Sequence, residues 1–341
     1  MAVTIKELSA ACGLSISTVS KALNDYPDVS AETRELVRAT AAKLGYRPSA
    51  IARGLKIGRT FNLGVLYSDD SESGFTHNYF APVLESFKNE AERKGYDITF
   101  ITHRTDHNHM TYLQHCLYRN VDGVCIVNCH FEDPEVIELL GSPLPVVTID
   151  YHYHNRSCVE SENRQGMTDL TRYILSKGHT RIAFISGEEN AVTTIRRTSF
   201  LRVMQEAGLP VPPEHQIHSR YHHPAAAREA TRQLLQLPNR PTCIIMADDY
   251  SALGGMEAIR DAGLRVPQDI SVAGYDGVGI LQMCRPQLTT VQQDTLRIGQ
   301  AAAQKLIQLI EEPHTTFQDV VSVPSHLIPG ETVGQAPAGQ D

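Results

Sequence analysis

Residues 4–24 read TIKELSAACGLSISTVSKALN, and this stretch is the most informative about the fold of the N-terminal part of the chain. Thr4 and Glu7 have the spacing of a capping box, which predicts that a short helix begins there. Gly13 ends that helix, and a second one is expected over residues 16–23. Two short helices joined by a glycine turn indicate a helix-turn-helix unit.

A third helix completes the predicted unit. It begins after Ser30, which is a good capping residue, and ends at Gly45. Val19 and Leu23 lie four residues apart on the second helix, so we expect them to pack against the third. The outward face of the second helix then carries Ile16, Ser17, Ser20 and Lys21. Any three-helix domain could show this periodicity, so the pattern alone does not establish DNA binding.

The charge is divided unevenly along the chain. The whole chain of 341 residues has a net charge of −8. Residues 1–60 carry nine basic and five acidic side chains, a balance of +4, so the rest of the chain is at −12. A basic N-terminal domain on an acidic body fits DNA contact confined to one end, although a solvated lysine-rich surface would give the same balance.

Several segments of residues 1–60 closely resemble the DNA-binding domain of the lac repressor family of bacterial regulators. The resemblance is carried by residues 4–8 (TIKEL), 13–15 (GLS), 17–24 (STVSKALN) and 44–49 (LGYRPS). It implies that the second helix enters the major groove, where Ile16, Ser17 and Lys21 face base edges. It also implies phosphate contacts from Thr4, Ser15, Ser20 and Asn24. For Ser20 and Asn24, local helix capping is an equally good interpretation.

Residues 49–59 form the predicted hinge between the two domains. The segment is long enough for about two helical turns, and a helix this short is marginal in water without a partner. In the lac repressor family it orders on operator DNA, and a pair of such helices enters the minor groove. The resemblance assigns Leu55 as the wedge that kinks the DNA and Ala52 as the point of close approach between the two helices. Packing of Leu55 under the following domain is the alternative.

Apolar strand-length runs alternate with amphipathic helices over residues 60–330. Continuous apolar strands with helices between them predict parallel sheets covered on both faces, here arranged as two doubly wound lobes. The helix at Tyr79–Lys94 shows the clearest apolar face. The predicted strands are Leu63–Tyr67, Ile98–Thr102, Gly123–Val127, Val146–Ile149, Ile182–Ile185, Cys243–Ala247 and Ile270–Gly274.

This alternation would also suit an enzyme, but no catalytic motif accompanies it. No Gly-x-Gly-x-x-Gly, phosphate-binding loop or Gly-x-Ser-x-Gly follows a predicted strand. The histidine-rich spots, which include His152, His154 and His222-His223, lack companion ligands at metal spacing, so we interpret them as surface residues. We therefore expect a protein that is not an enzyme and that has no cofactor and no metal.

The resemblance to the lac repressor family continues to about residue 329. It is carried by residues 185–187, by Arg196 with Ser199-Phe200, and by residues 247–254, 266–276 and 288–293. The implied fold is an all-α helix-turn-helix head followed by an α/β body of the periplasmic-binding-protein type, with three crossovers between the lobes. Carried over residue by residue, the implied effector contacts are Phe75, Phe80, Asp150, Arg196, Tyr221, Asp248, Asp276 and Gln293. Helix-face packing is an alternative for Phe80, a surface ion pair is an alternative for Arg196, and Arg197 is a rival for its role.

The chemistry of these residues suits a polyol. Carboxylates and a guanidinium bind neighbouring hydroxyls, and aromatic rings cover the C–H face of a sugar. Asp248 stands where many relatives have Asn, so three carboxylates face one or two arginines, which disfavours an anionic effector. We expect a neutral mono- or disaccharide, with an amine-bearing sugar or a nucleoside as alternatives. A solute-binding protein without a DNA role is the alternative from another functional class.

These expectations define the organisation of the chain. We place a DNA-binding head at 1–48, a hinge at 49–59, an effector domain at 60–332 and a disordered tail at 333–341. Within the effector domain the N-lobe takes 60–159 and 292–321, and the C-lobe takes 160–291 and 322–332. The chain has no apolar leader, so we expect a cytoplasmic protein that does not contact a membrane. Because a two-fold dimer reads a palindrome, we also expect a homodimer that binds double-stranded operator DNA.

Overall fold

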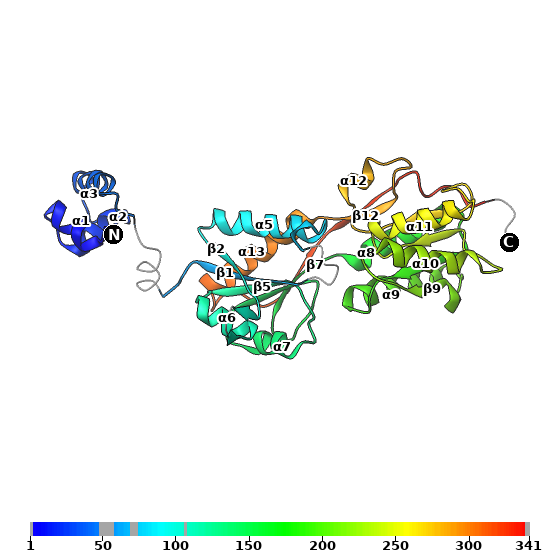
Figure 1. Ribbon diagram of the computed structural model, residues 1–341, viewed down its shortest axis with the longest axis horizontal. Helices are drawn as coiled ribbons and strands as arrows, with labels where there is room; N and C mark the ends of the chain where they lie inside the picture. The colour runs from blue at the N-terminus through cyan, green and yellow to red at the C-terminus, as the bar shows by residue number, and fades with distance from the viewer. Residues whose placement is uncertain (1–2, 48–57, 69–73, 106–107, 338–341) are drawn as a thin grey trace. The chain divides into compact units, whose positions relative to one another are not determined.

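The computed structural model describes residues 3–47, 58–68, 74–105 and 108–337 (Figure 1). Contacts divide the chain into two compact units, Met1–Phe61 and Asn62–Asp341. Ala52 and Leu55, the two hinge residues singled out by sequence, lie outside the described residues. The first unit is all-α, and the second is an α/β body.

The first unit contains the three predicted helices, α1 (Ile5–Cys12), α2 (Ile16–Leu23) and α3 (Ala31–Leu44). Gly13 has a φ of 66°, a backbone conformation that favours glycine, and this permits the tight turn between α1 and α2. Six side chains from the three helices and the loop before α3 form the core: Leu8, Val19, Ala22, Val29, Val37 and Ala41. Burial of Val19 sets the rotation of α2 and leaves Ile16 and Ser17 exposed.

The N-lobe of the body is built on a parallel six-stranded sheet in the order β13-β7-β6-β5-β1-β2. Helices α5 and α13 pack together on one face, and α6 and α7 lie on the other (Figure 1). Short elements η1 (Gly74–Thr76), β3 (Arg104–Thr105) and β4 (Asn108–His109) complete the lobe. The main elements are β1 (Asn62–Tyr67), α5 (Phe80–Arg93), β2 (Asp97–Phe100), α6 (Tyr112–Arg119), β5 (Gly123–Asn128), α7 (Pro134–Gly141), β6 (Val146–Ile149), β7 (Ser157–Ser161), α13 (Thr295–Glu311) and β13 (Val320–Val323).

The C-lobe repeats this plan with four parallel strands in the order β11-β10-β8-β9. Helices α8 and α9 pack together, as do α10 and α11. The antiparallel pair β12–β14 and the short α12 lie beside this sheet. The elements are α8 (Asn163–Ser176), β8 (Ile182–Ser186), α9 (Ala191–Glu206), η2 (Pro213–His215), β9 (Gln216–His218), α10 (Pro224–Leu235), β10 (Cys243–Ile245), α11 (Asp249–Asp261), β11 (Ser271–Ala273), α12 (Gly279–Gln282), β12 (Thr290–Gln293) and β14 (Ser325–Ile328).

The central strands of the C-lobe are apolar throughout because both faces of the sheet are covered. Alternate residues of β8 and β10 enter two different cores: Phe184 and Ile245 join one, whereas Ala183 and Ile244 join the other. This burial explains why continuous apolar runs predicted the strands correctly. All seven predicted strands and the Tyr79–Lys94 helix are confirmed, with ends that differ by no more than two residues.

The chain passes between the lobes three times, as expected. The passages run from β7 into α8, from β12 into α13 and from β13 into β14. Parallel strands end at the same edge of a sheet, so the segments after β6, β10 and β11 lie where the lobes meet. This arrangement positions the candidate effector site.

The prediction of a disordered tail is wrong for residues 333–337. Val333 is buried in the C-lobe core, and the Gly334 amide donates to Ser271 Oγ at 3.1 Å. Farther along, the Ala336 amide donates to the Lys177 carbonyl at 2.8 Å. The glycine- and proline-rich composition suggested disorder, but these backbone hydrogen bonds and one apolar anchor hold the segment on the lobe.

Candidate DNA interface and effector site

The exposed face of α2 carries the side chains predicted to read DNA. Ile16 and Ser17 are exposed, and both point away from the buried Val19. Lys21 forms an ion pair with Asp28, and this hydrogen bond raises the pKa of Lys21 and lowers the pKa of Asp28. In the head without DNA, the lysine is therefore already engaged by a carboxylate.

Three of the four residues predicted to contact phosphate, Thr4, Ser15 and Asn24, also have capping roles within the head. Thr4 and Glu7 form the predicted capping box, and Ser15 Oγ accepts from the Thr18 amide at 3.1 Å. The side chain of Asn24 donates to the Ser20 carbonyl at 2.7 Å. For Asn24 this is the capping interaction that the sequence left as an alternative. A helix N-terminus capped by serine still directs amide groups outward, which suits a phosphate.

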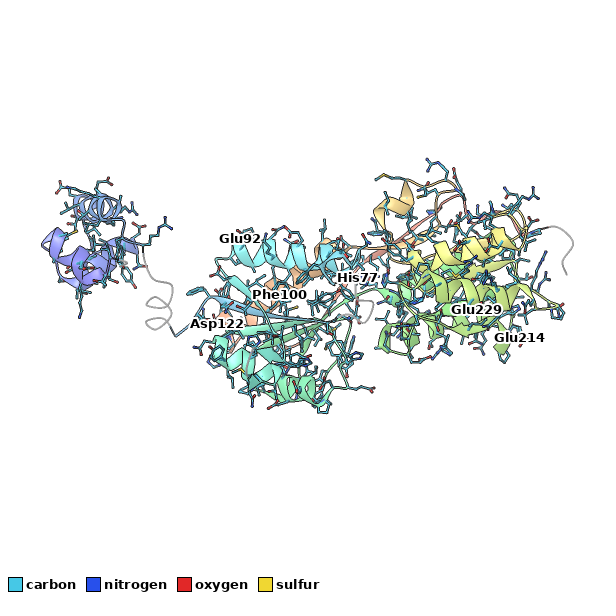
Figure 2. The ribbon with its side chains drawn as sticks, viewed as in Figure 1. His77, Glu92, Phe100, Asp122, Glu214 and Glu229 are labelled. Carbon is cyan, nitrogen blue, oxygen red and sulfur yellow. The ribbon has the colours of Figure 1, made fainter. Side chains whose placement is uncertain are left out.

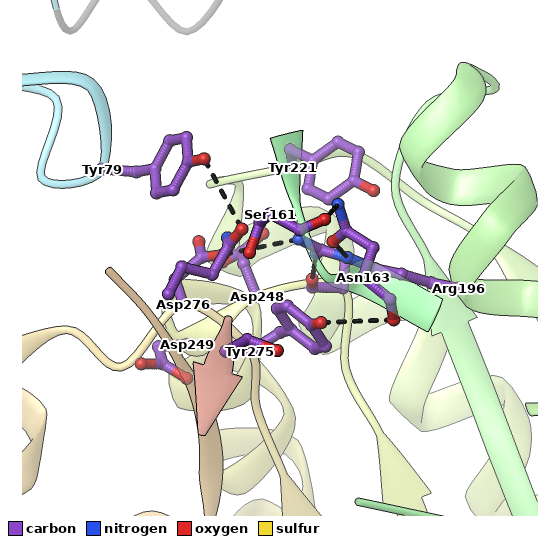
Figure 3. A network of polar contacts seen from close by, with 12 residues as sticks. Tyr79, Ser161, Asn163, Arg196, Tyr221, Asp248, Asp249, Tyr275 and Asp276 are labelled. Atoms are coloured by element: carbon purple, nitrogen blue, oxygen red, sulfur yellow. Dashed lines mark hydrogen bonds and ion pairs between the residues drawn. The ribbon is translucent and has the colours of Figure 1, made fainter. Parts of the chain in front are cut away.

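The body contains a buried polar cluster made by residues from both lobes (Figure 3). Arg196 of α9 is buried, and its Nε donates to Asn163 Oδ1 at 2.8 Å while Nη1 donates to the Ala247 carbonyl at 3.2 Å. Its guanidinium lies 3.6 Å from the centre of the Tyr275 ring. These contacts fix the guanidinium plane and direct Nη2 towards Asp276, 3.9 Å away.

Asp276 lies just beyond β11 with a φ of 106°, which is unusual for a residue other than glycine. Its Oδ1 accepts from Gln293 Nε2 at 2.7 Å, and its backbone N–H donates to the Val291 carbonyl at 2.8 Å. Burial raises the pKa of Asp276 to about 7, and this effect outweighs the opposing influence of the Arg196 charge. Burial therefore destabilises the charged form of the Asp276 carboxyl group unless a further partner stabilises that charge.

Asp150 occupies the corresponding place in the N-lobe, directly after β6. Its Oδ1 accepts from the Ser161 amide at 3.0 Å, and its Oδ2 accepts from the Tyr79 hydroxyl at 3.1 Å. The same hydroxyl lies 3.5 Å from Gln293 Oε1. Burial raises the pKa of Asp150 and, well above its usual value, that of Tyr79. Tyr79 and Gln293 therefore connect the two aspartates across the lobes.

Three comparisons with known proteins agree with this architecture. Residues 4–49 match the family described as bacterial regulatory proteins, lacI family, and residues 171–333 match a periplasmic binding protein-like domain. The transcriptional repressor PurR of Pectobacterium atrosepticum is 33% identical over 341 residues, covering 98% of each chain. The chain belongs to the LacI family.

Two further relatives span nearly the same length. Catabolite control protein A of Priestia megaterium is 31% identical, covering 96% of this chain and 98% of the relative. The structure of the lac repressor dimer bound to operator and the anti-inducer ONPF superposes with a TM-score of 0.83 at 25% identity, covering 98% of this chain and 100% of that one. The LacI-family protein is a DNA-binding transcriptional repressor and not an enzyme.

Asp248, a predicted effector contact, also caps a helix in this LacI-family repressor. Its side chain is 0% exposed, and Oδ1 accepts from the Ser251 amide at 2.8 Å, so it caps α11. Its Oδ2 accepts from Ser251 Oγ at 2.9 Å and from the His222 amide at 2.8 Å. The carboxylate belongs to the cluster, but its oxygens are engaged in positioning α11 and His222.

Of the three aromatic residues predicted to contact the effector, Tyr221 and Phe80 lie in or beside the polar cluster, whereas Phe75 does not. Tyr221 packs its ring against Gly187 and places its hydroxyl 2.8 Å from Thr193 Oγ1 in the C-lobe. Burial raises the pKa of this hydroxyl. Phe80 lies beside Tyr79, with ring centres 4.9 Å apart, at the edge of the cluster.

Phe75 is not brought to this group. It is 63% exposed and packs edge-on against Phe100, 4.8 Å away. Both rings line a cavity of about 690 Å³ between α5 and β2. This cavity has a largely apolar lining and contains no residue of the polar cluster, so we assign it no role in effector binding.

Several residues of the cluster were missed by sequence reasoning. Asn163, Tyr275 and Tyr79 hold Arg196 and Asp150, as described above. Asp249 is buried and accepts from Thr290 Oγ1 at 2.6 Å and from the Val278 amide at 2.7 Å, so it braces the loop before α12. Burial raises the pKa of Asp249 well above its usual value. Its position beside Asp248, directly after a predicted strand, was the available signal.

The interpretation of the histidines as surface residues is correct for His152, His154 and His223 but wrong for His222. Its side chain is 15% exposed and lies between Asp248 and Asp276. Within the described residues, no group of three histidine, cysteine or acidic side chains could hold a metal ion. No helix in the same part of the chain is long and apolar enough to cross a membrane.

Proposed function

We propose that this repressor binds a palindromic operator as a homodimer and that a small neutral saccharide, bound by the polar cluster between the lobes, controls this binding. The observation that carries the proposal is the buried pairing of Arg196 and Asp276 with Asp150 close by. Fixed acceptors and a fixed guanidinium fit a ligand whose neighbouring hydroxyls both donate and accept hydrogen bonds.

The balance of charge in the cluster supports a ligand without negative charge. Asp248 and Asp276 are buried, Asp150 is partly buried, and Arg196 is the cluster's buried guanidinium. Placing an anion beside these carboxylates would add like-charge repulsion in a region with little water. The same excess of carboxylates favours an amine-bearing sugar as the second candidate, since its ammonium group would pair with Asp276.

The mechanism follows from the two-lobed fold. A ligand that contacts Asp150 and Arg196 at once favours one relative position of the lobes over others. We propose that this change alters the spacing at which the paired hinge segments meet the operator, and so changes DNA affinity. Ligand-induced release and ligand-dependent binding are both compatible with this scheme.

Titration calorimetry with a panel of neutral saccharides, amino sugars and nucleosides tests the proposal. We expect one neutral saccharide to bind and Asp276→Asn to weaken that binding at least tenfold, the loss expected for one buried charged hydrogen bond. Arg197→Lys is the matched control, because Arg197 pairs with Glu189 at the surface. Selective binding of an amino sugar or a nucleoside alone would overturn the saccharide assignment.

A further inference from the structure

Two histidines, one from each lobe, meet beside the polar cluster. His77 lies three residues before the start of α5 in the N-lobe, where Figure 2 labels it, and His222 lies two residues before α10 in the C-lobe. Their ring centres are 4.1 Å apart, with the planes inclined by 70°. His77 is only 3% exposed. This contact joins the lobes without involving any of the three chain crossovers.

His77 is fixed to the start of α5. Its Nδ1 accepts hydrogen bonds from the amides of Tyr79 at 3.2 Å and Phe80 at 3.3 Å. These hydrogen bonds assign the ring proton to Nε2. Tyr79, whose amide bonds to this histidine, donates from its hydroxyl to Asp150. His77 is therefore linked through Tyr79 to the N-lobe part of the cluster.

His222 is fixed by the C-lobe part of the cluster. Its φ is 49°, and its amide donates to Asp248 Oδ2. Its ring nitrogens lie 3.8 Å from Asp276 Oδ2 and 4.0 Å from Asp248 Oδ1. Both distances are too long for direct hydrogen bonds but short enough for the two carboxylates to orient the ring electrostatically.

A second polar contact lies next to the histidines. Asn78 of the N-lobe donates through Nδ2 to the hydroxyl of Tyr250, in the first turn of α11. The Tyr250 and His222 ring centres are 5.9 Å apart, so both contacts belong to one surface. Asp248 caps the same helix turn that carries Tyr250. The C-lobe side of this surface is therefore built directly on cluster residues.

We propose that His77 and His222 form a latch between the lobes, and that Asp276 and Asp248 position it, so that lobe closure is coupled to the state of the polar cluster. Opening the lobes separates the two rings, and changing the charge or partners of Asp276 alters the orientation of His222. The latch rests on the contacts alone, whereas its role in effector response rests on the proposed function. Any ligand that engages Asp276 then shifts the opening equilibrium through a residue it need not touch.

Hydrogen–deuterium exchange of the full-length protein without ligand tests the latch. His222→Asn removes the imidazole, and asparagine tolerates the positive φ. We expect exchange of the Tyr79 and Phe80 amides, in the opposite lobe, to rise roughly tenfold, as for the loss of a contact that opposes local opening. His223→Asn is the matched control, because it alters the adjacent histidine and keeps an acceptor for the Ala226 amide.

Double variants separate a latch from a local packing role. The His77→Asn background keeps a capping acceptor for α5. In this background, His222→Asn should change the exchange rate of the amides in residues 79–84 by less than about twofold. In an Asp276→Asn background, the effect of His222→Asn on the same exchange rates should likewise fall below about twofold. An unchanged exchange rate at Tyr79 and Phe80 in His222→Asn would overturn the latch. A full effect that persists without Asp276 would overturn the coupling to the cluster, whatever the effector proves to be.

Discussion

At the scale of single residues, the effector site depends on charges that burial makes costly and that neighbouring groups compensate only in part. Arg196 is the central example: burial opposes its charge, yet Tyr275, Tyr221 and the carboxylates of Asp276 and Asp150 outweigh this effect and raise its pKa. The charge of Asp276 is less well compensated, which leaves its pKa near 7. The site is thus prepared for a ligand that supplies the missing hydrogen bonds.

Asp276→Asn should change how stability depends on pH. The pKa of Asp276 rises from 3.8 to about 7 on folding, so the folded protein holds this proton more tightly than the unfolded chain does. The resulting stabilisation is present at low pH and is lost as the pH rises from about 4 towards 7. Relative to wild type, the variant should become more stable as the pH is raised from 5 to 8. Its free energy of unfolding relative to wild type should rise by on the order of 1 kcal/mol for each pH unit up to about 7. Urea unfolding at the two pH values measures this, and a difference that does not vary with pH would contradict it.

Arg196→Lys should destabilise the body. The lysine supplies one point charge in place of the fixed guanidinium that bonds Asn163 and the Ala247 carbonyl, so at least one buried acceptor loses its donor. We expect a loss of about 2 kcal/mol in the free energy of unfolding, measured by urea denaturation. Arg197→Lys, at the surface, should change it by less than about 0.5 kcal/mol. Equal effects of the two substitutions would show that the guanidinium contacts carry no stability.

At the scale of elements, strands with a continuous apolar run were predictable from the sequence, and strands of mixed polar and apolar composition were not. β8 and β10 stand out because each of their apolar residues enters a core. β7, with the sequence Ser-Cys-Val-Glu-Ser, and β9 have no such run, and only pairing with a neighbouring strand makes them strands. The same limit explains His222: its partners follow β10 and β11 or precede α5, so nothing in the adjacent sequence indicates its role.

The recognition helix α2 yields a prediction of its own. Asp28 competes with DNA for Lys21, so Asp28→Asn should strengthen operator binding several-fold by freeing the lysine. Lys21→Gln should weaken binding roughly tenfold and lower the slope of log affinity against log salt by about one. Fluorescence anisotropy at several salt concentrations measures both. Lys6→Gln on α1 is the control, and no change in Asp28→Asn would mean that the ion pair persists on DNA.

At the scale of the whole molecule, two features concern assembly: the predicted hinge and an apolar surface on the N-lobe. The surface lies along α5 and the edge strand β2, where Phe75 and Phe100 line the cavity between them. An open edge beside exposed aromatic rings is suited to a second copy of the chain. We expect Phe100→Asp to shift the protein towards monomer, as measured by light scattering after size exclusion. Exposed Phe317→Asp is the control, and an unchanged dimer would place the interface elsewhere.

Leu55→Ala tests the hinge predicted from the sequence. If Leu55 wedges into the operator, the substitution should weaken specific DNA binding about a hundredfold, because the unstacked base step loses its apolar partner. Effector affinity should remain within about twofold of wild type, since the residue lies outside the effector domain. Operator affinity and saccharide affinity are measured on the same preparation. Equal loss of both would contradict the division into a DNA-binding part and an effector-binding part.

The most direct test of the central claim is selection of DNA by the purified protein from a pool of palindromic duplexes, with and without a saccharide panel, at two salt concentrations. We expect sequence-selective binding with a steep salt dependence, and one saccharide that abolishes or strengthens it. Selective binding that responds to no saccharide would contradict the proposed effector. The absence of selective DNA binding would contradict the assignment of the helix-turn-helix unit to operator recognition.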